Sequence, residues 1–250
     1  LKTGSCRYGS ILNEAAGVID DLLVYRKAQD LWMSVINAAT IEKDKQHFQK
    51  HLTKDAVFTD LSETLGKIDL QGPLARAIIE KIAPDAGRLS YYTFLETDIL
   101  GEKNIISRTG YTGELGFEIY ATLQHIPRVW HRLLEDDRVK PAGLGSRDIL
   151  RLEMGYSLYG QDIDETTTPK EAGLERFIDS NKDFIGKDAL QKQTTSRRRI
   201  FFKSLSRRSP RHGHGLFDKN LRIGEVTSGS FSPHLNCGIG MGFIKNASAR

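Results

Sequence analysis

A single carboxylate in an apolar strand, directly after a cluster of glycines, is the most chemically suggestive feature of the sequence. Residues 110–116 contain three glycines in seven positions, and they lead into 117–120, where Glu118 and Tyr120 share one face of a predicted strand. Glycines permit close approach of a planar ligand or of another backbone. A buried carboxylate is costly without a partner, so we expect Glu118 to accept hydrogen bonds from the protein or from a ligand. The alternative is a solvated carboxylate at a sheet edge.

Two more charged side chains lie on apolar elements. Asp21 belongs to the segment 18–25, where Asp20 and Asp21 point to opposite sides of a strand that is apolar on both faces. Arg147 falls in the first turn of a helix for which Ser146 is a candidate N-cap. The helix dipole disfavours a cation there, so we infer a nearby anion from the protein or from a ligand. A carboxylate beside a bound amine could position it or stabilise a developing positive charge.

Several ring and amide side chains could surround such a ligand, although tyrosines at these spacings are more often part of a core. The candidates are Tyr8, Tyr25, Asn37, Tyr91, Tyr92, Tyr111 and Tyr156.

Other kinds of site have little support. Cys6 and Cys237 are the two cysteines and lie far apart, which argues against a disulfide framework. His212 and His214 lack accompanying metal ligands, so a turn is favoured over a metal site. We find no phosphate-binding loop, no dinucleotide fingerprint and no nucleophile elbow, so no metal, flavin or nicotinamide is expected.

The net charge of +4 is concentrated in the arginine-rich segment 197–211. This segment could bind nucleic acid or an acidic partner, but no ladder of aromatic residues accompanies it, and a solvated inter-domain segment is favoured. No apolar run approaches the length of a membrane span.

The order of the predicted elements has α+β character. We expect strands over 10–26 with a turn at Gly17, a strand over 31–36, and a helix capped by Thr40 that runs to about Leu52. A helix opens with Pro73 in its first turn.

Further strands and helices follow along the chain. Strands are expected over 91–100 and 104–109, joined by a hairpin at Glu102-Lys103, and a helix over 126–135. The polar segment 156–169 is predicted to cross between domains, and short strands follow from about residue 200.

Five separated segments, in the same order along the chain, resemble the aminomethyltransferase (T-protein) family of the glycine cleavage system. They are GVIDDL (17–22), RTGYTGELGFE (108–118), AGLGSRDILRLE (142–153), LYGQDIDETTTP (158–169) and GEVTSGSFSP (224–233).

The resemblance implies a multi-domain α+β fold that binds folate. Its three domains are arranged like a cloverleaf, and the last of them is β-barrel-like. The implied domains are 1–72 with about 167–199, then 73–166, and a partial β domain at 200–250. We expect the chain to be a fragment or processed form, because the family has an additional N-terminal portion and a longer barrel.

The implied reaction transfers the methylene carbon from the aminomethyl-lipoyl arm of the H-protein to tetrahydrofolate and releases ammonia. Tetrahydrofolate would be a co-substrate, and lipoylated H-protein the partner, with no membrane or nucleic acid involved. The resemblance also suggests a monomer, located in the cytoplasm if bacterial and in the mitochondrial matrix if eukaryotic.

The resemblance assigns residue roles as well. Asp21 matches the catalytic aspartate, Glu118 the pterin-binding residue and Arg147 a folate-binding arginine. The side chains at pocket-lining positions are Tyr8, Tyr25, Asn37, Tyr111 and Tyr156. Lys67 and Asp69 depart from the family, which is usually apolar at these positions.

Other functions remain open at the level of the sequence. One is a folate-dependent demethylase module of the sarcosine or dimethylglycine type, and another is an inactive folate-binding remnant. The folate protein linked to iron–sulfur maintenance has a cysteine motif that Tyr159-Gly-Gln161 lacks. A nucleic-acid-binding protein that uses 197–211 is the least favoured.

Overall fold

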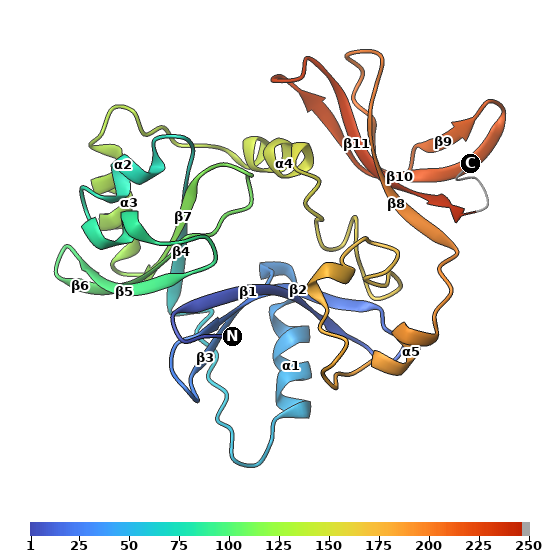
Figure 1. The fold of residues 1–250 in the computed structure, drawn as a ribbon. Coiled ribbons are helices and arrows are strands. Elements are labelled where there is room, and N and C mark those ends of the chain that lie inside the picture. The colour runs from blue at the N-terminus through green and yellow to red at the C-terminus, as the bar shows by residue number, and fades with distance from the viewer. Residues whose placement is uncertain (247–250) are drawn as a thin grey trace. The chain divides into compact units, whose positions relative to one another are not determined.

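The computed structural model describes residues 1–246, drawn as a ribbon in Figure 1. The chain divides into two compact units. Unit 1 consists of residues 1–7 and 23–144, and unit 2 of residues 8–22 together with the described residues from 145 onward. The division falls within β1 (Ser5–Leu12) and β2 (Val18–Arg26), so each unit contains part of both strands.

The first sheet has three strands in the order β1-β2-β3, with β3 at Trp32–Val35. The interior position of β2 confirms the prediction from its two apolar faces. After a 3₁₀ turn at Ala38–Thr40, α1 runs from Ile41 to His51. Thr40 occupies the N-cap position, but its hydroxyl donates to the carbonyl of Asn37 (2.9 Å) and to Asp44 Oδ2 (3.0 Å). The expected side-chain cap is wrong, because the Thr40 side chain accepts no hydrogen bond from the first N–H groups of the helix.

The main sheet of unit 1 is antiparallel and has the order β4-β7-β6-β5. Its strands are β4 (Leu65–Gln71), β5 (Phe94–Ile99), β6 (Glu102–Ser107) and β7 (Gly116–Thr122). The turn between β5 and β6 lies at Leu100 and Gly101, with φ of +52° and +86°, and not at Glu102-Lys103. A tight hairpin requires such left-handed residues, and Gly101 adopts this conformation without strain.

One face of this sheet packs on the core of unit 1. The helices α2 (Ala75–Ile79) and α3 (Ile126–Leu134) and a 3₁₀ turn at Pro84–Arg88 accompany this core. Its buried side chains include Ile68, Leu70, Ile78, Ile79, Phe117, Ile119, Val129 and Leu133. Since side chains alternate along a strand, burial of Phe117 and Ile119 here places Glu118 and Tyr120 on the opposite face. The helix predicted at Pro73 begins two residues later, at Ala75.

Unit 2 contains α4 (Leu144–Glu153) from Gly145 onward, a 3₁₀ turn (Glu175–Phe177) and α5 (Lys187–Lys192). Its second part is an antiparallel sheet of β8 (Arg197–Lys203), β9 (Gly215–Asp218), β10 (Leu221–Ser232) and β11 (Cys237–Lys245), ordered β8-β11-β10-β9. Over the described residues this sheet is barrel-like but not closed. The predicted N-cap at Ser146 is wrong, because α4 begins at Leu144, and Arg147 still falls in its first turn.

The polar segment 156–169 packs within unit 2. Ile163 is buried with Leu12, Val18 and Leu174 in an apolar cluster that also includes Leu190. This apolar anchor holds the segment against the ends of β1 and β2, although most of its residues are polar.

The remaining predictions of local structure concern cysteine and histidine. Cys6 is a buried free thiol and Cys237 a half-buried one, which confirms the absence of a disulfide between them. His212 and Gly213 form the predicted turn, with φ of +80° at Gly213. Within residues 1–246 no helix is long and apolar enough to span a bilayer.

Candidate functional site

Glu118 lies at the centre of a buried polar network in unit 1. Its side chain is about 4% exposed, and its Oε1 accepts a hydrogen bond from Lys67 Nζ at 2.7 Å. The other oxygen, Oε2, accepts from Thr109 Oγ1 at 2.6 Å and from Tyr120 OH at 3.0 Å. The alternative of a solvated carboxylate at a sheet edge is therefore wrong. Glu118 has the partners that its burial requires.

These partners keep Glu118 ionised. Burial by itself raises the pKa of Glu118, but the charge and hydrogen bond of Lys67, together with the two hydroxyl donors, hold that pKa below its ordinary value. Burial and the nearby Glu118 charge raise the pKa of Tyr120, so this phenol remains a donor. Glu118 is thus a buried negative acceptor held in place by polar neighbours.

Tyr25 connects β2 to this network. It is fully buried, and its hydroxyl lies 3.0 Å from Tyr120 OH and 3.1 Å from Ser107 Oγ. Ser107 Oγ in turn lies 2.6 Å from Thr109 Oγ1. Tyr25 is thus linked to Glu118 through the hydroxyl of Tyr120. A contact between Tyr25 and a ligand stays a prediction.

The glycines before β7 make room for a protein side chain. A Cβ at Gly110 or Gly116 would lie 2.1 or 2.0 Å from Gln71 Oε1. Gln71 accepts a hydrogen bond from Thr112 Oγ1 (2.9 Å) and donates to the carbonyl of Thr109 (3.2 Å). The expected close approach therefore exists, but its partner is an amide side chain at the end of β4. This amide fixes the loop that carries Thr109.

Asp21 has a different setting, in unit 2. It is half-buried on β2, and Tyr8 OH on β1 donates to its Oδ2 at 2.8 Å. The ring of Tyr8 packs edge-on against Phe177, with ring centroids 4.7 Å apart. Asp20, its neighbour in sequence, is fully buried, as expected if the two carboxylates face opposite sides. Of these side chains, the structure brings Tyr8 and Asp21 together.

The strand that carries Asp21 is held by the segment 156–169. Val18 N donates to the carbonyls of Asp164 (3.1 Å) and Thr167 (3.0 Å). A Cβ at Gly17 would lie 1.8 Å from the carbonyl oxygen of Glu165, so another residue would clash with the backbone. The segments 17–22 and 158–169 lie far apart in sequence but are neighbours in unit 2, and Gly17 permits their contact.

Arg147 lies in the first turn of α4, which is anchored by a buried cation one turn later. Arg151 is 1% exposed and donates to Asp162 Oδ2 at 2.7 Å and to Ser228 Oγ at 2.9 Å. Asp148 Oδ1 accepts from Arg151 Nε at 2.8 Å. This network joins α4 to β10 and fixes the helix that presents Arg147.

The other pocket candidates are half-buried and dispersed along the chain. Asn37 follows β3, Tyr111 lies in the glycine loop and Tyr156 follows α4. Their contact with a ligand stays a prediction. Across the described part of the chain, no group of three or more His, Cys, Asp or Glu side chains could hold a metal ion.

The arginine-rich segment has a structural role in part. Arg197 donates to Glu171 Oε1 at 3.2 Å and lies over the ring of Phe243 at 4.5 Å. Arg199 hydrogen-bonds to Ser157 and lies 5.1 Å from the ring of Phe201. Residues 197–203 therefore form a strand, β8, with paired cations, and not a solvated connector.

Sequence reasoning missed the partners of Glu118. Lys67 departs from the family pattern, and the resemblance assigns no role to Thr109 or Tyr120. The pairing of Asp69 with Glu118 and of Lys67 with Tyr120 across β4 and β7 brings Lys67 to the carboxylate. The sequence does contain a signal for Lys67, because it is a charged residue at strand spacing in an otherwise apolar segment.

Comparison with known proteins agrees with this architecture. Residues 1–182 match the family model of the GCVT N-terminal domain, and residues 197–250 match that of the glycine cleavage T-protein C-terminal barrel domain. An aminomethyltransferase of Pseudothermotoga lettingae is 44% identical over 98% of this chain and 70% of the relative. One of Thermosipho melanesiensis is 46% identical over 98% of this chain and 69% of the relative.

A solved structure is also similar. The crystal structure of glycine cleavage system aminomethyltransferase T from Bartonella henselae has a TM-score of 0.89 and 37% sequence identity, and the match covers 99% of this chain and 70% of that one.

The fold is that of a tetrahydrofolate-dependent one-carbon transferase. The chain belongs to the glycine cleavage T-protein family. Its function is that of the family, a tetrahydrofolate-dependent aminomethyltransferase of the glycine cleavage system. The demethylase and inactive-remnant alternatives are not favoured by these comparisons.

Proposed function

We propose that Glu118 binds the pterin ring of tetrahydrofolate, that Arg147 binds its anionic tail, and that Asp21 is the catalytic carboxylate. The observation that carries this assignment is the buried Glu118 in β7, which accepts hydrogen bonds from an ammonium and two hydroxyls. A carboxylate can accept two hydrogen bonds from the ring amino group and the adjacent N–H of a pterin. The donor set of the ligand and the acceptor on the protein are thus complementary.

Arg147 suits the charged end of the same ligand. A cation in the first turn of α4 is disfavoured by the helix dipole, and an anionic tail would compensate for this. The Arg151 network keeps α4 in place, so the guanidinium of Arg147 can be presented at small entropic cost.

The methylene donor in our proposal is the aminomethyl-lipoyl arm of the H-protein. Cleavage of the carbon–nitrogen bond releases ammonia and leaves an electrophilic carbon on the lipoyl sulfur. Folate N5 attacks this carbon and N10 then displaces the sulfur, so the arm leaves as the dihydrolipoyl thiol, and the protons of the two folate nitrogens leave with the ammonia and the thiol. Asp21 orients the folate and stabilises the positive charge that develops. This chemistry demands positioning more than a strong base, and a half-buried carboxylate held by Tyr8 meets that demand.

Turnover with an aminomethylated carrier tests the proposal. The protein is mixed with tetrahydrofolate and lipoylated, aminomethylated H-protein, and methylenetetrahydrofolate and ammonia are measured together. Equimolar formation of both products is expected. Product formation from sarcosine or dimethylglycine, and none from the carrier, would instead establish the demethylase alternative.

Binding is tested separately by titration with tetrahydrofolate. Replacement of Glu118 by Ala is expected to weaken affinity by roughly one to two orders of magnitude, since a charge-assisted pair of hydrogen bonds is lost. Unchanged affinity of the Glu118→Ala variant would contradict the assignment of the pterin site.

Oligomeric state and location are part of the same proposal. We expect a monomer, which light scattering after gel filtration would test. The similar proteins named above are bacterial, and for a bacterial chain we expect the cytoplasm. For a eukaryotic chain the expected compartment is the mitochondrial matrix.

A further inference from the structure

One partner of Glu118 is more exposed to solvent than the other two. The Glu118 side chain is about 4% exposed, and that of Lys67 is 31% exposed. Thr109 and Tyr120, which also donate to the carboxylate, are 4% and 6% exposed. Lys67 is therefore the donor that reaches Glu118 from the solvent side, while the two hydroxyls hold it from within the protein.

A count of acceptor positions leads to the same residue. An ionised carboxylate offers about four lone-pair positions. Thr109 and Tyr120 use two of them and Lys67 uses a third. One position is left by these three donors, and removal of the ammonium frees a second, which gives the two that the amino group and the adjacent N–H of a pterin require.

The displaced ammonium has a second acceptor within reach. Lys67 Nζ lies 3.1 Å from Asp69 Oδ1, and Asp69 is paired with Glu118 across β4 and β7. Lys67 and Asp69 are two residues apart, so both lie on the sheet face that carries Glu118. The cation bridges two carboxylates in this structure. It can leave one of them and keep the other without losing its charge partner.

We propose that Lys67 is a displaceable counter-ion of Glu118, which reduced pterin binding moves onto Asp69. The inference rests on the proposed role of Glu118 as the pterin-binding residue. In the ligand-free protein Lys67 compensates the buried charge, and in the complex the pterin N–H groups replace it. The affinity for tetrahydrofolate then includes the cost of breaking the Lys67–Glu118 pair.

A double-mutant cycle on tetrahydrofolate affinity tests this inference. Lys67→Met removes the competing cation and should tighten binding about three- to tenfold, within the range of a partly exposed ion pair. Asp69→Asn removes the alternative acceptor and should weaken binding by a similar factor. In the Lys67→Met background, Asp69→Asn should have no effect, because no ammonium remains to be held.

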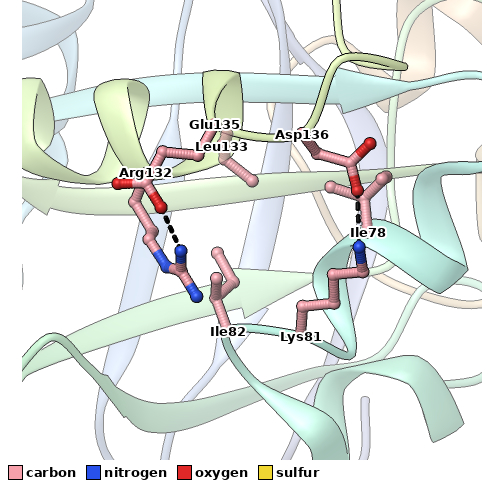
Figure 2. A pocket seen from close by; sticks show the side chains of 7 residues that line it. All are labelled: Ile78, Lys81, Ile82, Arg132, Leu133, Glu135 and Asp136. Carbon is pink, nitrogen blue, oxygen red and sulfur yellow. Dashed lines mark hydrogen bonds and ion pairs between the residues drawn. The ribbon is translucent and has the colours of Figure 1, made fainter.

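A matched control is available elsewhere in unit 1. Lys81 Nζ and Asp136 Oδ2 are also 2.7 Å apart, beside a hollow of about 200 Å³ (Figure 2). Ile78 and Leu133, which line this hollow, belong to the core on the opposite face of the sheet from Glu118. Lys81→Met should leave tetrahydrofolate affinity unchanged. Lys67→Arg keeps a cation at this position. It therefore separates an effect of the lost charge in Lys67→Met from an effect on folding.

The outcomes separate the two proposals. If Glu118→Ala does not weaken binding, the pterin assignment fails, and this inference fails with it. If Glu118→Ala weakens binding but Lys67→Met does not tighten it, the displacement of Lys67 is wrong and the pterin site stands. Equal effects of Asp69→Asn in both backgrounds would also overturn the displacement. Thermal denaturation of each variant establishes that the titrated protein is folded.

Discussion

The two carboxylates with proposed roles, Glu118 in unit 1 and Asp21 in unit 2, have different surroundings. Glu118 is nearly inaccessible and accepts hydrogen bonds from an ammonium and two hydroxyls. Asp21 is half-buried, and Tyr8 donates to one of its oxygens. Lys67 compensates the charge of Glu118, and the Tyr8 phenol donates a hydrogen bond to Asp21.

The difference matches the roles proposed for the two residues. A binding carboxylate gains from burial, because hydrogen bonds to it are stronger away from water, provided that the empty site is stabilised. A carboxylate that responds to charge developing in a reaction must be accessible to the reacting atoms. Each of the following experiments perturbs one side of this comparison.

The largest effect is expected for Asp21→Asn. The substitution keeps the shape and removes the charge, so kcat should fall about 10²- to 10³-fold, as for loss of one electrostatic stabiliser of a transition state. Tetrahydrofolate affinity, measured by titration, should change little. Turnover within threefold of the unmodified protein would contradict the catalytic role.

Gly17→Ala tests whether the Asp21 strand depends on the packing of residues 156–169. The added Cβ would lie 1.8 Å from the Glu165 carbonyl oxygen, which is backbone and cannot easily move. We expect destabilisation of about 3 kcal/mol by overpacking, measured by chemical denaturation. Gly9→Ala is the control, because a Cβ at Gly9 would have no neighbour within 4 Å. Equal losses of stability in Gly17→Ala and Gly9→Ala would contradict the close packing of Gly17 against residues 156–169.

Glu118→Gln tests the buried charge of unit 1 through the pH dependence of stability. The pKa of Glu118 in the folded protein is lowered from its ordinary value of 4.5. Its ionisation therefore stabilises the fold fully above pH 4.5, and this contribution is lost as the pH falls through the lower, folded pKa. At pH 7 the variant should be roughly 1–3 kcal/mol less stable.

That stability difference should shrink below pH 4.5, where Glu118 in the unmodified protein becomes protonated. Denaturation curves at pH 7 and at acidic pH measure it directly. A gap that is constant or widens on acidification would mean that Glu118 is not held ionised by its neighbours.

The smallest effect is expected for Tyr8→Phe, which removes the hydroxyl that donates to Asp21 at 2.8 Å. The ring and its edge contact with Phe177 remain. A hydrogen bond from a phenol to a half-buried carboxylate contributes about 1–1.5 kcal/mol, so kcat should fall roughly five- to tenfold with little change in folding. A loss as large as that of Asp21→Asn would assign Tyr8 a direct part in the chemistry.

The sequence predicted much of the local structure that carries the site. Strand alternation placed Glu118 and Tyr120 on one face, and the two apolar faces of residues 18–25 identified an interior strand. The need of a buried carboxylate for a partner followed from its charge alone. Strand alternation and apolar faces depend on residues that are neighbours in the sequence, so a single sequence displays them directly.

The identities of the partners could not be predicted in the same way. Lys67 reaches Glu118 through the register of β4 against β7, and Gln71 fills the space above Gly110 and Gly116. Both depend on which strands pair and in which register, which residue types do not specify. Thr40 and Leu100 departed from expectation for local reasons. The Thr40 hydroxyl bonds to Asn37 and Asp44, and the tight turn between β5 and β6 places left-handed residues at Leu100 and Gly101.

A crystal structure of the complex with tetrahydrofolate tests the central claim most directly. The account predicts that the pterin amino group and adjacent N–H donate to Glu118, that Lys67 pairs with Asp69, and that Asp21 lies beside the reacting edge of the folate. A pterin bound without contact to Glu118, or with Asp21 remote from its reacting nitrogen, would contradict it.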